Sequence, residues 1–355
     1  MIALQRLTSS ATSFISGTPP AKRRRIDYLA AAPSNGVPIR CRPWFEDGNI
    51  VLETEGKQFK VYKGILAANS PIFKDLFALA QPSGNEEVDG CPLVQLSDSA
   101  LDLGWVLEAL HDSERRKNTS GKSMTYSVLI AFLRLGRKYE IQHIRDQALE
   151  KLELEFPTTW RGYLARITAH RESTTATGYI APREILAMVN ILRENDLAGF
   201  LPAALYRCFV DDQKGRVSIF QESSDGPAQP RPILRVEDIK ACSRAYKKLI
   251  RLQAAECFAW LRSQDRYCYY SASCYREKSL IEGKIFFPVP LCVPLGEWDA
   301  TWVSSLCSVC AASGQAAFLK GSKEIWEQLP ALFGLPNWED DDFTFSYFFT
   351  SSNSS

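Results

Sequence analysis

The chain of 355 residues lacks the features that mark exported proteins, membrane proteins and nucleic-acid binders. Its formal net charge is +1, so no overall field attracts nucleic acid or a lipid surface. Residues 1–15 have no positive start followed by a long apolar run, which argues against a secretory signal, while their lack of acids keeps a mitochondrial-transit interpretation open. The most apolar later run, Ile285–Leu295, is broken by three prolines and cannot cross a bilayer as a helix. We therefore expect a nuclear or cytoplasmic protein with no direct nucleic-acid or membrane partner.

Histidine is scarce, and the motifs of common enzymes are missing. The three histidines lie at positions 111, 143 and 170, none in a recognisable relation to a Ser or Cys nucleophile. The sequence contains no H-E-x-x-H, G-x-S-x-G or G-x-G-x-x-G motif. A triad assembled only in space stays open. We expect a non-enzymatic protein with no catalytic residue and no cofactor.

Cysteine, by contrast, is present at ten positions, and without an export signal we expect reduced thiols. Cys307 and Cys310 have the C-x2-C spacing of half a zinc site, with Cys268, Cys274 and Cys292 as candidate partners upstream. No second close pair and no nearby histidine accompanies them. The sequence therefore favours buried thiols over zinc, because reduced cysteines are among the most buried side chains.

Residues 1–42 have the composition of a disordered arm, rich in Ser, Thr, Pro, Gly and Ala. The arm carries four consecutive cations, which would suit an acidic groove on a nuclear import receptor. The alternative is an ordinary solvated charge run. The candidate import residues are Lys22, Arg23, Arg24 and Arg25.

The segment from Trp44 to Phe77 predicts a β-hairpin followed by two short helices. Strands are indicated at Ile50–Leu52 and Phe59–Tyr62, where side chains alternate, with a polar turn around Gly56. Ser70 and Pro71 are the residues preferred at the start of a helix. That second helix is expected to bury Ile72, Phe73, Leu76 and Phe77, and a third strand is expected at 92–96.

The rest of the chain predicts mainly helices. Helical spacing occurs at 103–110, 124–138 and 141–154, with a tight corner at 139–140. Residues 156–338 are expected to form a helical C-terminal region, with helices near 160–170, from 182, at 201–210 and from 239 to 260 or beyond. Residues 339–355 form an acidic and aromatic tail, which either docks a partner or folds over its own core.

These elements and their residues resemble a BTB/POZ domain over residues 43–155. The arrangement with the later helices is similar to an expanded family of BTB proteins in mushroom-lineage fungi. The resemblance implies an α+β fold, with a small three-stranded sheet and a helical cluster, followed by a mostly helical region. The residues that carry it are Asp47, Ile50, Phe59, Val61, Lys63, Leu66, Ser70, Phe73, Leu96 and Asp98.

The resemblance implies a protein-binding module that forms homodimers and acts as a scaffold or adaptor. Dimers of this family use the first helix and the segment before it, so the interface candidates are Trp44, Phe45, Ile65 and Leu66. Two alternatives remain: a substrate adaptor for a cullin-type ubiquitin ligase, and a nuclear transcription co-regulator that recruits other transcription regulators.

Two places depart from the family pattern. Position 62 is Tyr where the family commonly has His. The helix before the charged loop at 114–122 ends in Leu110-His111-Asp112, where the family usually has an aromatic-rich end. A feature that depends on histidine is therefore not expected at position 62.

Overall fold

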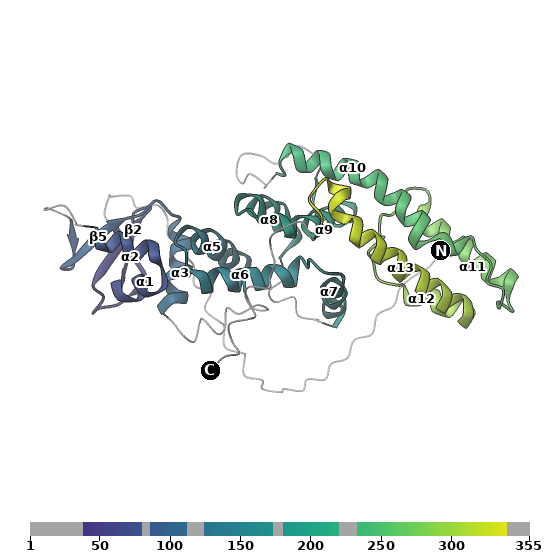
Figure 1. Cartoon of the computed structure of the whole chain (residues 1–355), viewed down its shortest axis with the longest axis horizontal. Coiled ribbons are helices and arrows are strands. Elements are labelled where there is room, and N and C mark those ends of the chain that lie inside the picture. The colour runs from purple at the N-terminus through teal and green to yellow at the C-terminus, as the bar shows by residue number, and fades with distance from the viewer. Residues whose placement is uncertain (1–37, 80–85, 112–123, 173–179, 220–232, 339–355) are drawn as a thin grey trace, which may run out of the picture.

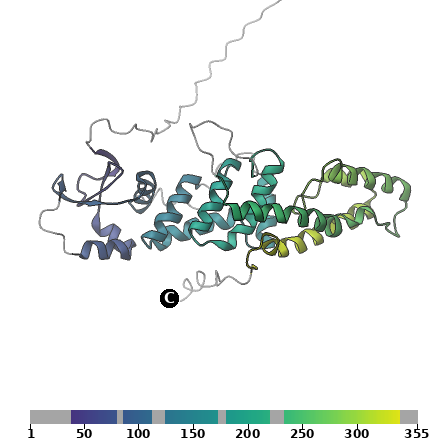
Figure 2. The same cartoon turned by 90° about the horizontal axis from the view of Figure 1, so that it is seen from above.

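The computed structural model describes residues 38–79, 86–111, 124–172, 180–219 and 233–338. Within these ranges the molecule is elongated, with a small sheet and its short helices at one end (Figures 1 and 2). The last helices of the chain form the opposite end. The predicted import residues Lys22–Arg25, the charged loop at 114–122 and the tail at 339–355 lie outside the described residues.

The sheet confirms the predicted hairpin and adds strands to it. β2 (Ile50–Thr54) and β3 (Lys57–Val61) pair antiparallel, with Ile50 opposite Val61. The turn between them is Glu55–Gly56, both with positive φ, which is the two-residue hairpin turn that glycine favours. The prediction of three strands was too low: in the described residues the order is β1-β3-β2-β5-β4. The other strands are β1 (Ile39–Trp44), β4 (Glu87–Val88) and β5 (Cys91–Gln95).

Strand β1 begins inside the segment that composition assigned to the disordered arm. It runs parallel to β3, with Ile39 opposite Lys57, and Pro43 sits near its end at the edge of the sheet. An edge strand tolerates proline and exposed arginines, because one of its sides faces no other strand. The alternation of Ile39 and Cys41 with two arginines is short and ends at Pro43, so the strand is recognised from its pairing with β3.

Three short helices follow or cover the sheet: α1 (Lys63–Asn69), α2 (Pro71–Ala78) and α3 (Ala100–His111). As predicted, Ser70 caps α2, and its hydroxyl oxygen accepts a hydrogen bond from the Phe73 N–H at 3.0 Å. Phe73 is buried, but Ile72 is 38% exposed, so the expectation that it is buried was wrong. A helix of two turns packs one face only, and Ile72 lies beside that face.

The predicted helical corner lies between α5 (Tyr126–Lys138) and α6 (Gln142–Glu155). A Cβ atom on Gly136 would lie 3.3 Å from the Arg145 nitrogen, so the absence of a side chain at position 136 permits the close approach of the two helices. Tyr139 at the corner donates a hydrogen bond to buried Asp98, and Lys138 pairs with the same carboxylate at 2.6 Å. Asp98 thus joins the corner to the loop between β5 and α3.

The region after residue 156 is helical, as predicted. The helices begin close to the expected positions, and the last of them continues into a π-helical turn at Gln253–Cys257 and a 3₁₀ turn at Ala259–Leu261. The bounds are α7 (Trp160–Glu172), α8 (Pro182–Glu194), the 3₁₀ turn η2 (Ala198–Phe200), α9 (Leu201–Gln213) and α10 (Val236–Leu252).

The final third contains helices whose positions were not predicted individually: α11 (Ser271–Phe286), α12 (Ala300–Ser305) and α13 (Ser308–Phe333). Figure 1 shows α13 running alongside α10. Gly321 permits close packing, because a Cβ there would lie 2.4 Å from the Glu256 carbonyl carbon. Small residues on α13 therefore form a surface that packs closely against other helical turns, so the buried face of this helix is not marked by large apolar residues alone.

Buried apolar side chains form one continuous cluster from Ile50 in β2 to Phe333 in α13. Polar contacts cross the same junction: the Arg137 guanidinium of α5 donates to the Glu194 carbonyl at the end of α8 at 2.8 Å and pairs with Asp196 at 2.5 Å. The helical region therefore packs directly on residues 39–155. Within the described part of the chain, no helix combines the length and the apolarity needed to span a membrane.

Candidate protein-interaction surface

The segment before α1 carries two of the predicted interface residues. Trp44 ends β1 and is partly exposed, with the Arg40 guanidinium 4.6 Å from the centre of its ring. Phe45 follows, and its N–H donates to the Lys60 carbonyl at 2.9 Å, which extends the pairing with β3 by one residue. The sheet therefore fixes the backbone of this segment and leaves part of the Trp44 side chain in solvent.

Phe45, Tyr62 and His111 form an aromatic cluster beside the start of α1. The Phe45 ring lies 5.0 Å from Tyr62 and 5.3 Å from His111, centre to centre. The Tyr62 hydroxyl donates to the Asp47 carboxylate at 2.5 Å, and this hydrogen bond raises the Tyr62 pKa. The His111 Nδ1 lies 2.8 Å from the Leu107 carbonyl and its Nε2 is 3.4 Å from the Tyr62 N–H, which is the pattern of a neutral imidazole donating through Nδ1.

The two departures from the family pattern therefore meet in space. The sequence treats Tyr62 and the Leu110-His111-Asp112 helix end as separate features, 49 residues apart. In the fold, the His111 imidazole lies against the Tyr62 backbone at the position where α1 begins. A histidine is thus present at this corner after all, supplied by α3 and not by position 62. Sequence reasoning missed this because α3 and β3 are adjacent only in the folded chain.

Helix α1 offers one of its two predicted interface residues to the surface. Ile65 is partly exposed, whereas Leu66 is fully buried in the core. Leu66 was therefore a wrong choice for an interface of the folded chain, since α1 turns that side chain toward the core. Trp44, Phe45 and Ile65 remain as candidates, and the contact between Phe45 and Tyr62 brings the first two next to the start of α1.

The remaining residues of the family pattern are structural. Phe59, Val61 and Phe73 are buried in the core. The Lys63 N–H donates to the Asn49 side-chain oxygen at 2.7 Å, and the Ser70 hydroxyl donates to the Tyr139 carbonyl at 2.5 Å. These contacts hold α1 and α2 on the sheet and on the α5–α6 corner, so the pattern specifies the scaffold and not a reactive site.

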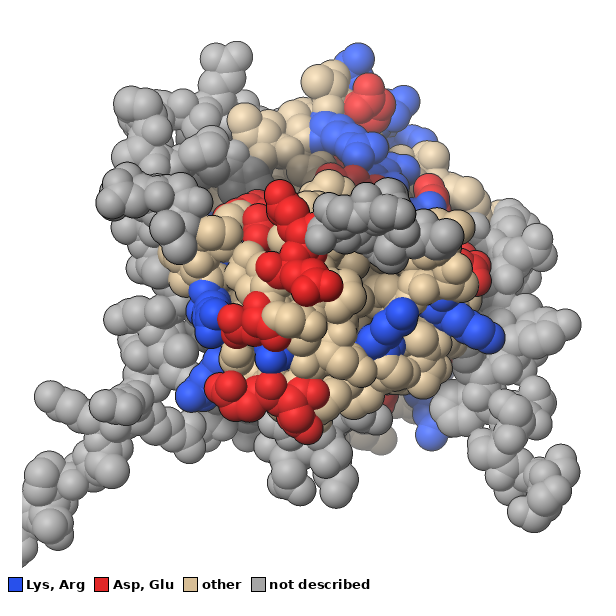
Figure 3. Space-filling model, turned by 90° about the vertical axis from the view of Figure 1, so that its left-hand side faces the viewer, with Lys and Arg blue, Asp and Glu red and all other residues tan. Residues whose placement is uncertain are grey.

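The end of the molecule that carries the sheet has charges of both signs. Figure 3 shows acidic side chains gathered over the middle and lower left of this face, with Lys and Arg on either side. The acidic residues at this end of the molecule include Glu86, Glu87 and Asp89, which are exposed in and beside the β4–β5 hairpin. Arg40 pairs with Asp89 at 2.7 Å across the sheet edge. Such a surface suits a protein partner with complementary charges.

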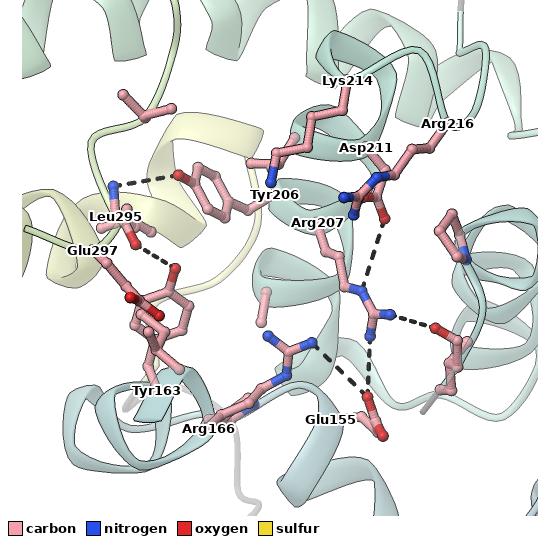
Figure 4. Close-up of a pocket in the computed structure, with 18 of the residues that line it drawn as sticks. Glu155, Tyr163, Arg166, Tyr206, Arg207, Asp211, Lys214, Arg216, Leu295 and Glu297 are labelled. Carbon is pink, nitrogen blue, oxygen red and sulfur yellow. Dashed lines mark hydrogen bonds and ion pairs between the residues drawn. The ribbon is translucent and has the colours of Figure 1, made fainter. Parts of the chain in front are cut away.

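A cavity of about 590 Å³ lies where α6, α7 and α9 meet the segment Val293–Glu297 (Figure 4). Its size is that of a small-molecule pocket. Two tyrosines close one side: the Tyr163 hydroxyl donates to the Leu295 carbonyl at 2.6 Å, and the Tyr206 hydroxyl accepts from the Leu295 N–H at 3.3 Å. Burial raises the pKa of both phenols, so they stay neutral.

Five charged groups of this cavity, those of Glu155, Arg166, Arg207, Asp211 and Arg216, form ion pairs with one another. Arg207 donates to the Glu155 carboxylate at 3.0 Å, and Arg216 pairs with Asp211 at 3.3 Å (Figure 4). Burial and the nearby Arg166 lower the Arg207 pKa, and Glu155 opposes them. Among the described residues that line the cavity there is no Ser, Cys or His, so the nucleophile and base of a triad are missing from them. The arrangement holds α6, α7 and α9 together.

The cysteines divide into two groups. Cys307 and Cys310 of the predicted half-site come together with Cys268 and Cys274, and their sulfur atoms all lie within 4.8 Å of one another. Cys292 is not among them; it is buried, and its N–H donates to the Gln213 side chain at 2.8 Å. Two of the three upstream partners named from the sequence are thus confirmed as neighbours.

Comparison with known proteins identifies the first part of the chain. The sequence profile of the BTB/POZ domain matches residues 42–155. This range begins near the end of β1 and includes strands β2 to β5, the aromatic cluster and the helices from α1 to α6. No curated protein and no solved structure matches the chain significantly. The chain therefore contains a BTB/POZ domain, a module for protein–protein interaction, followed by a mostly helical region.

Proposed function

We propose that this chain is a scaffold or adaptor that forms homodimers through its BTB/POZ domain and presents its helical region to a further protein. The observation that carries the proposal is the BTB/POZ match over residues 42–155, together with the partly exposed Trp44 and Ile65 at and just before the first helix. The absence of enzyme motifs in the sequence supports the same assignment.

The physical basis of the proposed dimer is the burial of apolar surface around Trp44 and Ile65. A stable interface buries about 1,600 Å² in total, and a few aromatic anchors supply most of its energy. Trp44 suits such an anchor because β1 and the Arg40 contact already restrict its movement. A side chain fixed before binding loses little conformational entropy when the partner arrives.

Light scattering on the full chain at micromolar concentration tests this proposal. The wild type is expected to have the mass of two chains, and the double variant Trp44→Ala/Ile65→Asp the mass of one. Leu280→Asp, at a residue of α11 that is 53% exposed, is the control and should remain dimeric. A monomeric wild type overturns the dimer, and a double variant that stays dimeric overturns the choice of surface.

A cullin-type ubiquitin ligase is a second candidate partner. The observation in its favour is that α7 begins at Trp160, soon after α6 ends at Glu155, and packs against it. Helices directly after a BTB/POZ domain could take the place of the additional cullin-contacting helices of other adaptors. Capture of the full chain by an immobilised cullin would support this role, and no capture of a folded dimer would exclude it.

A nuclear role rests on Lys22, Arg23, Arg24 and Arg25 and on the recruitment of transcription regulators. It predicts nuclear accumulation of the full chain and its loss when these four residues are replaced by alanine. A wild-type protein that stays in the cytoplasm contradicts it.

A further inference from the structure

Four cysteines from two stretches of the chain, 268–274 and 307–310, meet at the end of the molecule farthest from the sheet. Cys268 lies in the loop before α11, Cys274 lies in the first turn of α11, and Cys307 and Cys310 lie at the start of α13 (Figure 1). Cys274 and Cys310 are buried, and the other two are partly exposed. Chance packing of thiols in a core does not require four of them to converge from two stretches that are 33 residues apart.

The distances between the sulfur atoms fit a single tetrahedral metal ion. A zinc ion bonds to thiolates at about 2.3 Å, which places neighbouring sulfurs of a regular tetrahedron about 3.8 Å apart. The sulfurs of Cys268 and Cys307 are 3.7 Å apart, and all four lie within 4.8 Å of one another. Binding of the ion would draw the most distant sulfurs together by up to about 1 Å, a shift that side-chain rotation can supply.

Backbone hydrogen bonds already point at the sulfurs. The Cys307 N–H donates to the Cys274 sulfur at 3.4 Å, and the Cys310 N–H donates to the Cys307 sulfur at 3.4 Å. Such donors favour the thiolate form that binds metal. Outer contacts of this kind orient metal ligands and stabilise their charge.

A buried lysine supplies a second, independent observation. Lys278 of α11 is 5% exposed, and no carboxylate among the described residues forms an ion pair with it; its ammonium group donates to the Ser263 carbonyl at 2.9 Å. Lys278 follows Cys274 by four residues, so the two side chains lie on the same face of α11, and its ammonium group is 5.5 Å from the centre of the Trp260 ring. Zinc with four thiolates carries a net negative charge, which would balance this cation.

We propose that Cys268, Cys274, Cys307 and Cys310 bind one structural zinc ion that ties the loop before α11 and the starts of α11 and α13 together. Four thiolate ligands fill the coordination shell, as in structural and not catalytic zinc sites. The sequence favoured buried thiols because Cys268 and Cys274 are separated by five residues and do not look like a pair. The turn into α11 brings them together.

Metal analysis of the full chain tests the proposal directly. The protein is produced with zinc in the medium, purified without chelator in a non-thiol reductant, and analysed by mass spectrometry of the elements. One zinc per chain is the expected result. Metal-free protein overturns the site, and iron at the same stoichiometry overturns the choice of zinc.

Variants assign the ligands. Cys310→Ser should lose most of the bound zinc, whereas Cys292→Ser, at a buried cysteine outside the cluster, should keep it. Equal zinc contents in the two variants overturn the assignment. Should Cys310→Ser not fold, cobalt substitution in the wild type decides: four thiolates give intense sulfur-to-cobalt charge-transfer absorption, and its absence overturns the site.

Discussion

Glu155, at the end of α6, is predicted to be a main point of attachment between the BTB/POZ domain and the helical region. Its side chain is 2% exposed and lies 3.0 Å from Lys151, 3.0 Å from Arg207 of α9 and 3.9 Å from Arg166 of α7. The Lys151 side chain is itself only 4% exposed. The substitution Glu155→Gln keeps the size of the side chain and removes its charge.

The expected loss follows from the cations that remain. Removing one partner of a buried ion pair costs about 3–5 kcal/mol, because the remaining charge stays in a poorly solvated site. Glutamine can still accept one hydrogen bond, so we expect a loss of about 3 kcal/mol in the free energy of unfolding. Lys151→Met should cost less, since Glu155 would keep its contacts with Arg207 and Arg166.

Urea unfolding of the full chain, followed by circular dichroism, measures the effect. The control is Glu327→Gln in α13, which has the same four-residue spacing to Lys323 at 3.6 Å, but with side chains 57% and 58% exposed. This exposed pair should contribute no more than about 0.5 kcal/mol. A loss for Glu155→Gln no greater than that for Glu327→Gln would refute the reasoning.

Three further predictions concern other parts of the molecule. Gly321→Ala should destabilise the protein by about 1–3 kcal/mol in thermal unfolding, because its Cβ would lie 2.4 Å from the Glu256 carbonyl carbon. The control Gly283→Ala in α11, with nothing within 4 Å of the new Cβ, should instead stabilise it by up to about 1 kcal/mol; a shared sign would contradict both. Burial raises the pKa of Glu153, so the native state binds more protons than the unfolded chain between the unfolded value of about 4.3 and the raised native value. The contribution of Glu153 to stability is therefore greatest below this window and is lost as pH rises through it, and Glu153→Gln should gain stability relative to the wild type from pH 4 to 7; unfolding curves with a constant difference would disprove this. Ser70→Ala should cost about 1–2 kcal/mol in urea unfolding, since it removes the cap of α2 and a buried bond to the α5–α6 corner, and a change under about 0.3 kcal/mol would contradict the role.

The contact between Tyr62 and His111 shows that two departures from a family pattern, far apart in the sequence, can involve residues that touch in the fold. Tyr62 places its hydroxyl on Asp47, and the imidazole of His111 occupies the neighbouring position beside the Tyr62 N–H. The corner before α1 thus keeps an aromatic and polar cluster, although its members come from other positions. A sequence pattern alone records the substitution and not the compensation.

The local elements of this protein could be read from the sequence where side-chain spacing and turn chemistry agree. The β2–β3 hairpin has alternating apolar residues and a glycine turn, and α2 has Ser70 and Pro71 at its start; both signals act within a few residues. Helices α6 and α10 follow for the same reason, since their buried residues recur mainly every three or four positions.

Tertiary structure alone decided the features that depend on contacts between distant segments. Strand β1 lies at the edge of the sheet and is defined by its pairing with β3, and α13 carries small residues that fit against Glu256 and Trp260. The C-x2-C pair was visible in the sequence, but its partners became clear only when α11 placed Cys268 and Cys274 beside it. Spacing along a chain determines local conformation, whereas an edge strand, a close helix crossing and a four-ligand cluster exist only where separate segments meet in the folded protein.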